Sequence, residues 1–189
     1  MSLMICENAS HLAVYARGNP YQSTADVISY ATSECAFGHV LIARTVEGVW
    51  AILIGTADDL EADLADRFRK AKLVTNAAMV HDELAKVTRF VDRPAEGLDL
   101  PLDLRGTSFQ CRVWEKLGAI PLGRTVTYME LARWVGPLTS ARAVASACAA
   151  NPIALAVPCH RVVRNNGNLA DYRWGVERKH ELLRKEAMA

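Results

Sequence analysis

The chain has 189 residues, 51% of them apolar, and a formal net charge of +1. That is enough apolar material for a well-packed globular core, in one large domain or two small ones. The apolar run of residues 153–157, like every other apolar run in the chain, is far shorter than the roughly 20 residues that a membrane-spanning helix needs. Because the first residues also lack the pattern of a secretory signal peptide, we expect a cytoplasmic protein with no membrane span.

The small net charge hides an asymmetry between the two halves of the chain. Residues 1–100 hold nine Lys and Arg against fourteen Asp and Glu, whereas residues 101–189 hold thirteen against seven. The halves therefore carry net charges of −5 and +6. We expect a polyanion to bind to the second, basic half.

Cysteine is spread over the chain in an odd number and without a C-x-x-C pair. The five cysteines are Cys6, Cys35, Cys111, Cys148 and Cys159. This pattern argues against a disulfide framework and against a zinc ribbon, so reduced thiols are expected. Consecutive Cys and His residues are also poorly placed to chelate one ion. The sequence therefore predicts no metal site.

The first half indicates a small antiparallel sheet with helices. Residues 26–35 and 38–55 contain alternating or apolar runs typical of strands, and residues 45–48 predict a turn. Helices are expected over about 56–70, with a threonine at the N-cap, and near 77–91. Their apolar stripes are Leu60, Leu64 and Phe68, then Val80, Leu84, Val87 and Val91. We expect both helices to cover one face of the sheet.

The stretch 92–106 contains two prolines and two glycines without a helical period, which is typical of a connection. We therefore divide the chain into a tail or linker (1–25), an N-terminal α/β domain (26–98) and a C-terminal domain (99–189). The expected fold class is α/β in the broad sense (α+β). A small antiparallel-sheet domain with covering helices precedes a mainly helical domain with a helix-turn-helix.

That helix-turn-helix is predicted from helix punctuation. Thr107 with Gln110, and Thr127 with Glu130, form two capping boxes, so helices are expected to begin one residue after each threonine. A Gly-Pro pair ends the second helix, and a third helix is expected over 140–150 after a short turn. Two helices joined by such a turn are typical of DNA-binding proteins.

The third helix, SARAVASACAA, consists almost entirely of small residues. Small side chains suit a close helix–helix contact, but they also let a helix backbone approach a nucleic acid. The one long side chain, Arg142, and the basic charge of this half favour the second interpretation.

The hexapeptide PCHRVV follows an apolar run that predicts a buried strand ending at Pro158. Cys159 would then lie at a strand end. A free thiol has a pKa of about 8.5, so a reactive thiolate needs stabilisation, for which His160, Arg161 and Arg164 are candidates. Adjacent residues of an extended segment point to opposite faces, so the histidine would act through a water. From these residues alone, a structural cysteine beside a surface histidine remains an alternative.

Longer segments resemble the methylated-DNA–protein-cysteine methyltransferases, also called O6-alkylguanine-DNA alkyltransferases. The matching segments, in family order and spacing, are GTSFQCRVWEKLGAIPLGRTVTYMELA, ARAVASACAANPIALAVPCHRVV and YRWGVERKHELLRKEA. The resemblance is close over about 105–187 and looser over about 27–100. The chain most resembles the carboxy-terminal half of bacterial adaptive-response (Ada) proteins. It lacks their amino-terminal zinc module and regulatory domain, so no transcriptional activation is expected of these residues.

The resemblance implies DNA repair by a single, irreversible alkyl transfer. Cys159 matches the acceptor that attacks the alkyl carbon on guanine O6 and keeps the group as a thioether. His160, through a water, and Glu186 match the groups that activate the thiol. Asn151 matches the asparagine that braces the active-site turn, and Tyr128 the tyrosine that helps to expel the nucleotide and protonates the leaving guanine.

The implied partner is double-stranded DNA carrying O6-alkylguanine, with O4-methylthymine as a second candidate lesion. Arg142 matches the finger that fills the vacated place in the base stack. The other DNA-binding candidates are Tyr128, Ser140, Ala141, Ala145 and Ser146. The substrate-pocket candidates are Tyr172, Asp171, Val162 and Trp114. We expect a monomer that needs no cofactor and does not bind a membrane.

One position departs from the bacterial pattern Leu-Ser-Gly-Tyr-Arg-Trp-Gly. Asp171 stands where that pattern has glycine, at the rim of the implied pocket, so we hypothesise an altered tolerance of bulky alkyl groups.

Two other functions are open. A protein that binds alkylguanine without repairing it would share the helix-turn-helix, but relatives of that kind lack the acceptor cysteine. A cysteine hydrolase would need an oxyanion hole and a hydrolysable intermediate.

Overall fold

The computed structural model describes residues 27–169 and 171–189. The predicted tail or linker, residues 1–25, lies outside these described residues, as does Cys6. None of the helices in the described part is both long and apolar enough to cross a membrane.

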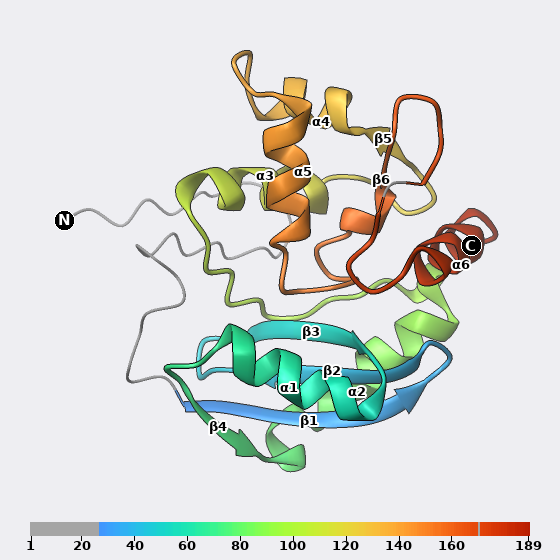
Figure 1. The fold of residues 1–189 in the computed structure, drawn as a ribbon. Helices are drawn as coiled ribbons and strands as arrows, with labels where there is room; N and C mark the ends of the chain where they lie inside the picture. The colour runs from blue at the N-terminus through green and yellow to red at the C-terminus, as the bar shows by residue number, and fades with distance from the viewer. Residues whose placement is uncertain (1–26, 170) are drawn as a thin grey trace.

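A four-stranded sheet forms the first half of the fold (Figure 1). Its strands are β1 (Val27–Cys35), β2 (Gly38–Arg44), β3 (Val49–Gly55) and β4 (Lys72–Thr75). The spatial order is β3-β2-β1-β4, with β2 antiparallel to both β3 and β1, and β4 parallel to β1. The antiparallel part and the turn between β2 and β3 confirm the prediction. The strand β4 was not predicted, because four residues, two of them exposed and two half-buried, leave no clear periodicity.

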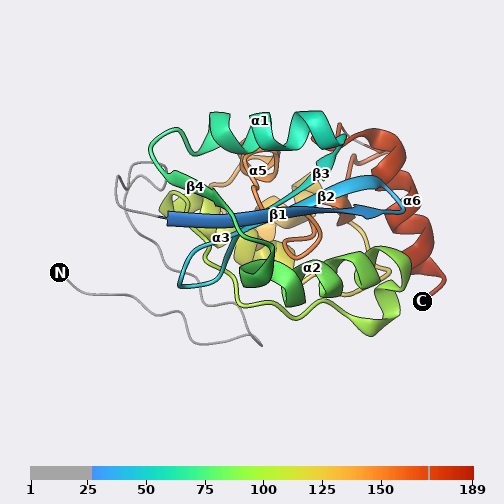
Figure 2. The same ribbon diagram turned by 90° about the horizontal axis from the view of Figure 1, so that it is seen from below.

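The two helices of this half lie on opposite faces of the sheet, so the prediction that both cover one face is wrong (Figure 2). They are α1 (Ala57–Arg67) and α2 (Ala77–Asp92). On the α1 side, Leu41 and Ala43 join one buried cluster, while on the α2 side Val40 and Ile42 join another. The physical reason is visible in β2 and β3, where the successive residues 40–43 and 49–54 are buried, as in sheets covered on both faces.

The predicted apolar stripes are confirmed on both helices. The residues Leu60, Leu64 and Phe68 pack in the α1 cluster, and Val80, Leu84, Val87 and Val91 pack in the α2 cluster. Full burial of each such side chain contributes about 1.5–3 kcal/mol. Thr56 occupies the N-cap of α1, but its hydroxyl bonds to the Asp59 carboxylate at 2.6 Å rather than to the helix backbone.

The second half is mainly helical and lies beside the β3 edge of the sheet (Figure 1). Its elements are η1 (Pro94–Glu96), α3 (Ser108–Gly118), β5 (Val126–Thr127), α4 (Tyr128–Val135), α5 (Ala141–Ala149), η2 (Cys159–Arg161), β6 (Val162–Val163) and α6 (Val176–Ala187). Both predicted capping boxes form with reciprocal hydrogen bonds, at Thr107–Gln110 and Thr127–Glu130. Each box provides hydrogen-bond acceptors for backbone N–H groups that would otherwise be unpaired, and this fixes where α3 and α4 begin.

The edge strand β3 joins the two halves through backbone hydrogen bonds. Val49 N–H donates to Pro101 in the connecting segment at 2.7 Å. Further along the same strand, Ile52 N–H donates to the Pro152 carbonyl at 3.0 Å, and Ala154 N–H donates to the Ile52 carbonyl at 3.0 Å. The sheet therefore braces the segment that precedes Cys159. Because buried residues of both halves also share one cluster, the domain boundary at residues 98 and 99 stays a prediction.

Candidate active site

The segment before Cys159 is buried, but it is not the strand that its composition predicts. Only Ile153 forms a single bridge, with Ile52, and residues 154–156 form a turn. Leu155 takes a φ of +68°, which reverses the chain direction. The flanking prolines lack N–H donors, so a regular ladder cannot extend here. Cys159 consequently opens the 3₁₀ turn η2 rather than ending a strand.

Asn151 holds this turn together with its side-chain amide. Its Nδ2 donates to the Val157 carbonyl at 2.8 Å and to the Sγ of Cys159 at 3.4 Å, and its Oδ1 accepts from Ile153 N–H at 2.9 Å. The asparagine is fully buried. An amide that bonds three parts of one turn fixes the position of the sulfur with little freedom.

Behind Cys159, a buried network links η2 to α6. The Nε2 of His160 lies 2.8 Å from Oε1 of Glu186. Arg161 donates to both carboxylate oxygens of Glu186, at 2.9 and 3.0 Å, and to the Ile120 carbonyl at 2.6 Å. His160 and Glu186 are almost fully buried. The carboxylate is thereby held by two partners from the same turn.

The electrostatics of this network assign the protons. Burial opposes ionisation of Glu186, but hydrogen bonds from His160 and Arg161 lower the pKa of Glu186 to about 2. Burial lowers the pKa of His160, so its imidazole is neutral at pH 7. An ionised carboxylate can only accept, so Nε2 carries the proton and Nδ1 keeps a lone pair. That Nδ1 is buried and has no hydrogen-bond partner among the described residues.

The thiol of Cys159 is 6% exposed, and burial raises its pKa. The amide of Asn151 and the charge of Lys179 act in the opposite direction. The predicted cation candidates are differently placed, since Arg161 bonds Glu186 and the exposed Arg164 lies 3.9 Å from Asp171. The thiol is therefore protonated at rest, and it needs a base before it can attack.

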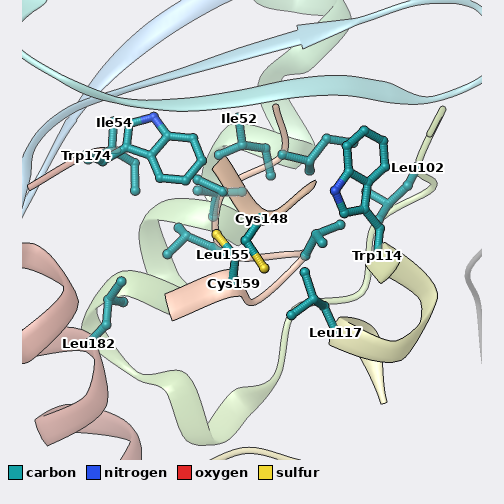
Figure 3. Close-up of a cluster of buried hydrophobic side chains, with 14 of the residues drawn as sticks. Ile52, Ile54, Leu102, Trp114, Leu117, Cys148, Leu155, Cys159, Trp174 and Leu182 are labelled. Carbon is teal, nitrogen blue, oxygen red and sulfur yellow. The ribbon is translucent and has the colours of Figure 1, made fainter. Parts of the chain in front are cut away.

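Aromatic side chains of the 171–175 segment form one wall of the site. The ring centroid of Tyr172 lies 6.3 Å from that of His160 and 5.1 Å from that of Trp174, both edge-on. Lys179 donates to the Val162 carbonyl at 2.6 Å and lies 6.0 Å from the centre of the Tyr172 ring. Figure 3 shows Trp174 and Cys159 in the same buried cluster.

Two polar atoms in this wall lack partners within the described residues, namely the Tyr172 hydroxyl and the Trp174 indole N–H. Buried polar groups are nearly always satisfied. A ligand with polar edges, such as a purine base, would supply the missing hydrogen bonds. No group of three or more His, Cys, Asp or Glu side chains suited to a metal gathers anywhere in residues 27–169 and 171–189.

On the surface beside the site, α4 and α5 form the predicted helix-turn-helix. Ser140 caps α5, accepting from Ala143 N–H at 3.2 Å, and Arg142 projects from the first turn as an exposed side chain. The remaining surface positions of α5 are small. A helix of this kind can lie close against a polyanion along its whole length.

Comparison with known proteins identifies the family. The family model "6-O-methylguanine DNA methyltransferase, DNA binding domain" matches residues 108–188. The inducible methylated-DNA–protein-cysteine methyltransferase of Bacillus subtilis is 33% identical over 152 residues, which cover 78% of this chain and 84% of that protein. The chain belongs to the methylated-DNA–protein-cysteine methyltransferase family. The recognition from sequence is thereby confirmed.

Other members of this methyltransferase family agree in sequence and in fold. The Escherichia coli protein named "Bifunctional transcriptional activator/DNA repair enzyme Ada" is 45% identical over 161 residues, covering 85% of this chain. The chain spans only 46% of the length of that relative. The crystal structure of the Mycobacterium tuberculosis OGT in complex with DNA matches with a TM-score of 0.66 and 31% identity, covering 85% of this chain and 93% of that one. The predicted mixed fold class is confirmed.

The structure brings together most of the methyltransferase site residues expected from sequence. Five of them surround the sulfur or the network behind it: Asn151, His160, Val162, Tyr172 and Glu186. Tyr128, at the start of α4, is half-buried, and burial with Cys148 and Cys159 nearby raises its pKa to about 12. Asp171 is fully exposed. Trp114 is fully buried and donates to the Ala147 carbonyl at 2.9 Å, so it fixes α3 against α5.

Sequence reasoning missed Lys179, a fully buried cation that acts on the Cys159 thiol. The sequence did contain a signal. The buried face of α6 consists of Lys179, Leu182 and Glu186, which are spaced three and four residues apart, as on one face of a helix. A lysine within such an apolar stripe is unusual unless it is paired or functional. That pattern is the feature which would have identified it.

Proposed function

We propose that this protein repairs alkylated DNA by moving the alkyl group from guanine O6 to the sulfur of Cys159, once per molecule. The observation that carries the proposal is the buried group formed by Cys159, His160 and Glu186. The Cys159 thiol is held by Asn151, and the next residue, His160, has an imidazole whose Nδ1 lone pair has no hydrogen-bond partner among the described residues. Family membership supports the same reaction.

The first step is removal of the thiol proton. The Nδ1 of His160 accepts it through an intervening water, and Glu186 stabilises the imidazolium that forms. Lys179 and the Asn151 amide favour the thiolate left behind. Proton transfer to His160 and stabilisation of the thiolate together offset the desolvation cost that otherwise keeps the buried sulfur neutral.

The thiolate then attacks the alkyl carbon on guanine O6. The new S–C bond forms as the C–O6 bond breaks, and the electron pair moves onto the guanine ring. Tyr128, whose phenol keeps its proton at neutral pH, donates that proton to the leaving base and is reprotonated from solvent. A thioether cannot be hydrolysed under these conditions, so the acceptor is consumed and the protein acts without turnover.

A guanine inside a duplex cannot reach a buried sulfur, so the base must leave the stack. Extrusion costs a few kcal/mol and is easier for a mispaired alkylguanine. We propose that α5 lies in the minor groove, with its small residues Ala141, Ala145 and Ser146 against the backbone and Arg142 filling the vacated place. Phosphate contacts from the basic half would give sequence-independent, salt-sensitive affinity.

We further propose that the protein acts as a monomer in the cytoplasm. The four cysteines of the described residues are free thiols, and a repair thiol remains active only where the surroundings are reducing.

The deciding experiment mixes the protein with duplex DNA that carries one O6-methylguanine and measures the mass of its tryptic peptides. We expect the peptide that contains Cys159 to gain one CH2 group, with one methyl per protein molecule. Cys159→Ala should bind the DNA without gaining mass. Tight binding by the parent without a mass gain would instead indicate a protein that recognises the lesion only, and repeated turnover would indicate a hydrolase. Duplex DNA with O4-methylthymine tests the second candidate lesion.

A further inference from the structure

A second buried thiol, Cys148, lies next to the acceptor. It occupies the last turn of α5, and burial raises its pKa, with Cys159 contributing in the same direction. Figure 3 shows the side chains of Cys148 and Cys159 side by side in the core. The alkyl transfer proposed above assigns no task to Cys148.

One residue connects both cysteines. The backbone N–H of Asn151 donates to the Cys148 carbonyl at 3.2 Å, while its side-chain amide donates to the Cys159 sulfur at 3.4 Å. The two thiols therefore belong to one braced unit, the end of α5 and the turn that follows it. Their separation is restricted by the fold even though ten residues lie between them in the sequence.

We propose that Cys148 is the partner thiol with which oxidised Cys159 forms a reversible disulfide. A peroxide first transfers one oxygen to the Cys159 sulfur, giving a sulfenic acid and releasing water or an alcohol. The Cys148 sulfur then attacks the sulfenic sulfur, the S–S bond forms, and the oxygen leaves as water with the Cys148 proton. A dithiol reductant restores both thiols.

The consequence concerns the fate of the acceptor. A thiol that can be activated for alkyl transfer is also open to oxidation by peroxide, and without a nearby thiol its sulfenic acid goes on to the irreversible sulfinic state. A disulfide with Cys148 would interrupt that sequence. The core around the two sulfurs is apolar and nearly closed to water, but a peroxide is small enough to follow the route that an alkyl group takes.

The chain offers a direct test because no Lys or Arg lies between the two cysteines. Trypsin therefore releases both in one peptide, residues 143–161. After treatment of the full chain with hydrogen peroxide, we expect this peptide to lose two hydrogens and to resist iodoacetamide until it is reduced. Reduction should then restore alkyl transfer.

Cys148→Ser and Cys111→Ser form a matched pair, since both remove a buried cysteine, and Cys111 is not part of the cluster that holds Cys148 and Cys159. Peroxide should add oxygen irreversibly to Cys159 in Cys148→Ser, whereas Cys111→Ser should behave like the parent. Equal recovery of both variants after reduction, or a parent peptide with added oxygen and no linkage, overturns the proposal. Because the mass readout requires no alkylated DNA, its outcome is independent of whether the repair reaction itself occurs.

Discussion

The Nε2 atom of His160 lies 2.8 Å from Oε1 of Glu186, across 26 residues of sequence, and both side chains are fully buried. The carboxylate orients the imidazole and fixes its tautomer, which leaves the lone pair of Nδ1 available for the role of base proposed above. Arg161 bonds the same carboxylate and keeps it ionised. The reactivity proposed for Cys159 therefore depends on a contact between the turn η2 and the last turn of α6.

Changing Glu186→Gln should remove the acid sensitivity that this carboxylate confers. The pKa of Glu186 is depressed to about 2, so its contribution to stability is complete above pH 4.5 and is lost as the pH falls toward 2. This shift of the pKa contributes about 3 kcal/mol to the free energy of unfolding of the parent. Urea unfolding between pH 7 and pH 3 measures the part of this contribution, about 2 kcal/mol, that is lost by pH 3. A parent and variant with parallel pH profiles would contradict the assignment.

The transfer rate should depend on pH through His160. Burial lowers the pKa of this imidazole below 6.5, so the base is neutral at pH 7 and becomes protonated only as the pH falls through its lowered value. The midpoint of the decline in the single-turnover rate should thus lie below pH 6.5. A midpoint above that value would show that His160 is not the base. Binding of lesion DNA, measured at each pH, separates affinity from chemistry.

Asn151→Ala should cost both stability and rate. The substitution leaves the Val157 carbonyl and the Ile153 N–H without hydrogen-bond partners and removes the contact to the Cys159 sulfur. Loss of such a buried network lowers the free energy of unfolding by about 2–4 kcal/mol. Urea unfolding and single-turnover transfer are the two readouts. The exposed Asn165→Ala serves as the control and should change neither. A variant of unchanged stability would mean that the turn is held by other contacts.

Arg142→Ala should separate base extrusion from chemistry. The side chain is exposed, so the free energy of unfolding should stay within about 0.5 kcal/mol of the parent value. Transfer from duplex O6-methylguanine should slow, while reaction with a free O6-alkylguanine base should keep its rate because nothing has to be flipped. Arg69→Ala, in the acidic half, is the matched control. Equal slowing on the free base would place Arg142 in the chemical step instead.

Asp171→Gly tests the rim of the pocket. Asp171 is fully exposed beside Arg164, and it precedes the buried Tyr172 of the pocket wall. If the aspartate shapes the opening, replacing it should change the ratio of the rates for benzyl and methyl substrates. The comparison uses duplexes that differ only in the alkyl group. Identical ratios in the variant and the parent would refute the hypothesis.

Local signals in the sequence predicted much of the fold. Both capping boxes, the helix stripes and the β2–β3 turn depend on residues within a few positions of one another, so composition and spacing were sufficient. The prediction failed where the structure of a segment depends on contacts with elements distant in the sequence. The helices α1 and α2 lie on opposite faces because the sheet is apolar on both sides, and 153–157 turns rather than extends because it meets β3 at a single bridge.

The sequence by itself determined the family and the helix-turn-helix, and it predicted Cys159 as the acceptor thiol, because the signal for each lies in contiguous residues. Only the tertiary structure decided how that thiol is controlled. It brought Glu186 to His160, Lys179 to the neighbourhood of the sulfur and Cys148 beside Cys159, and it placed the backbone of β3 against the turn. Proton positions and thiol reactivity depend on burial and on distances of a few ångströms, and those are set by packing between elements far apart in the chain.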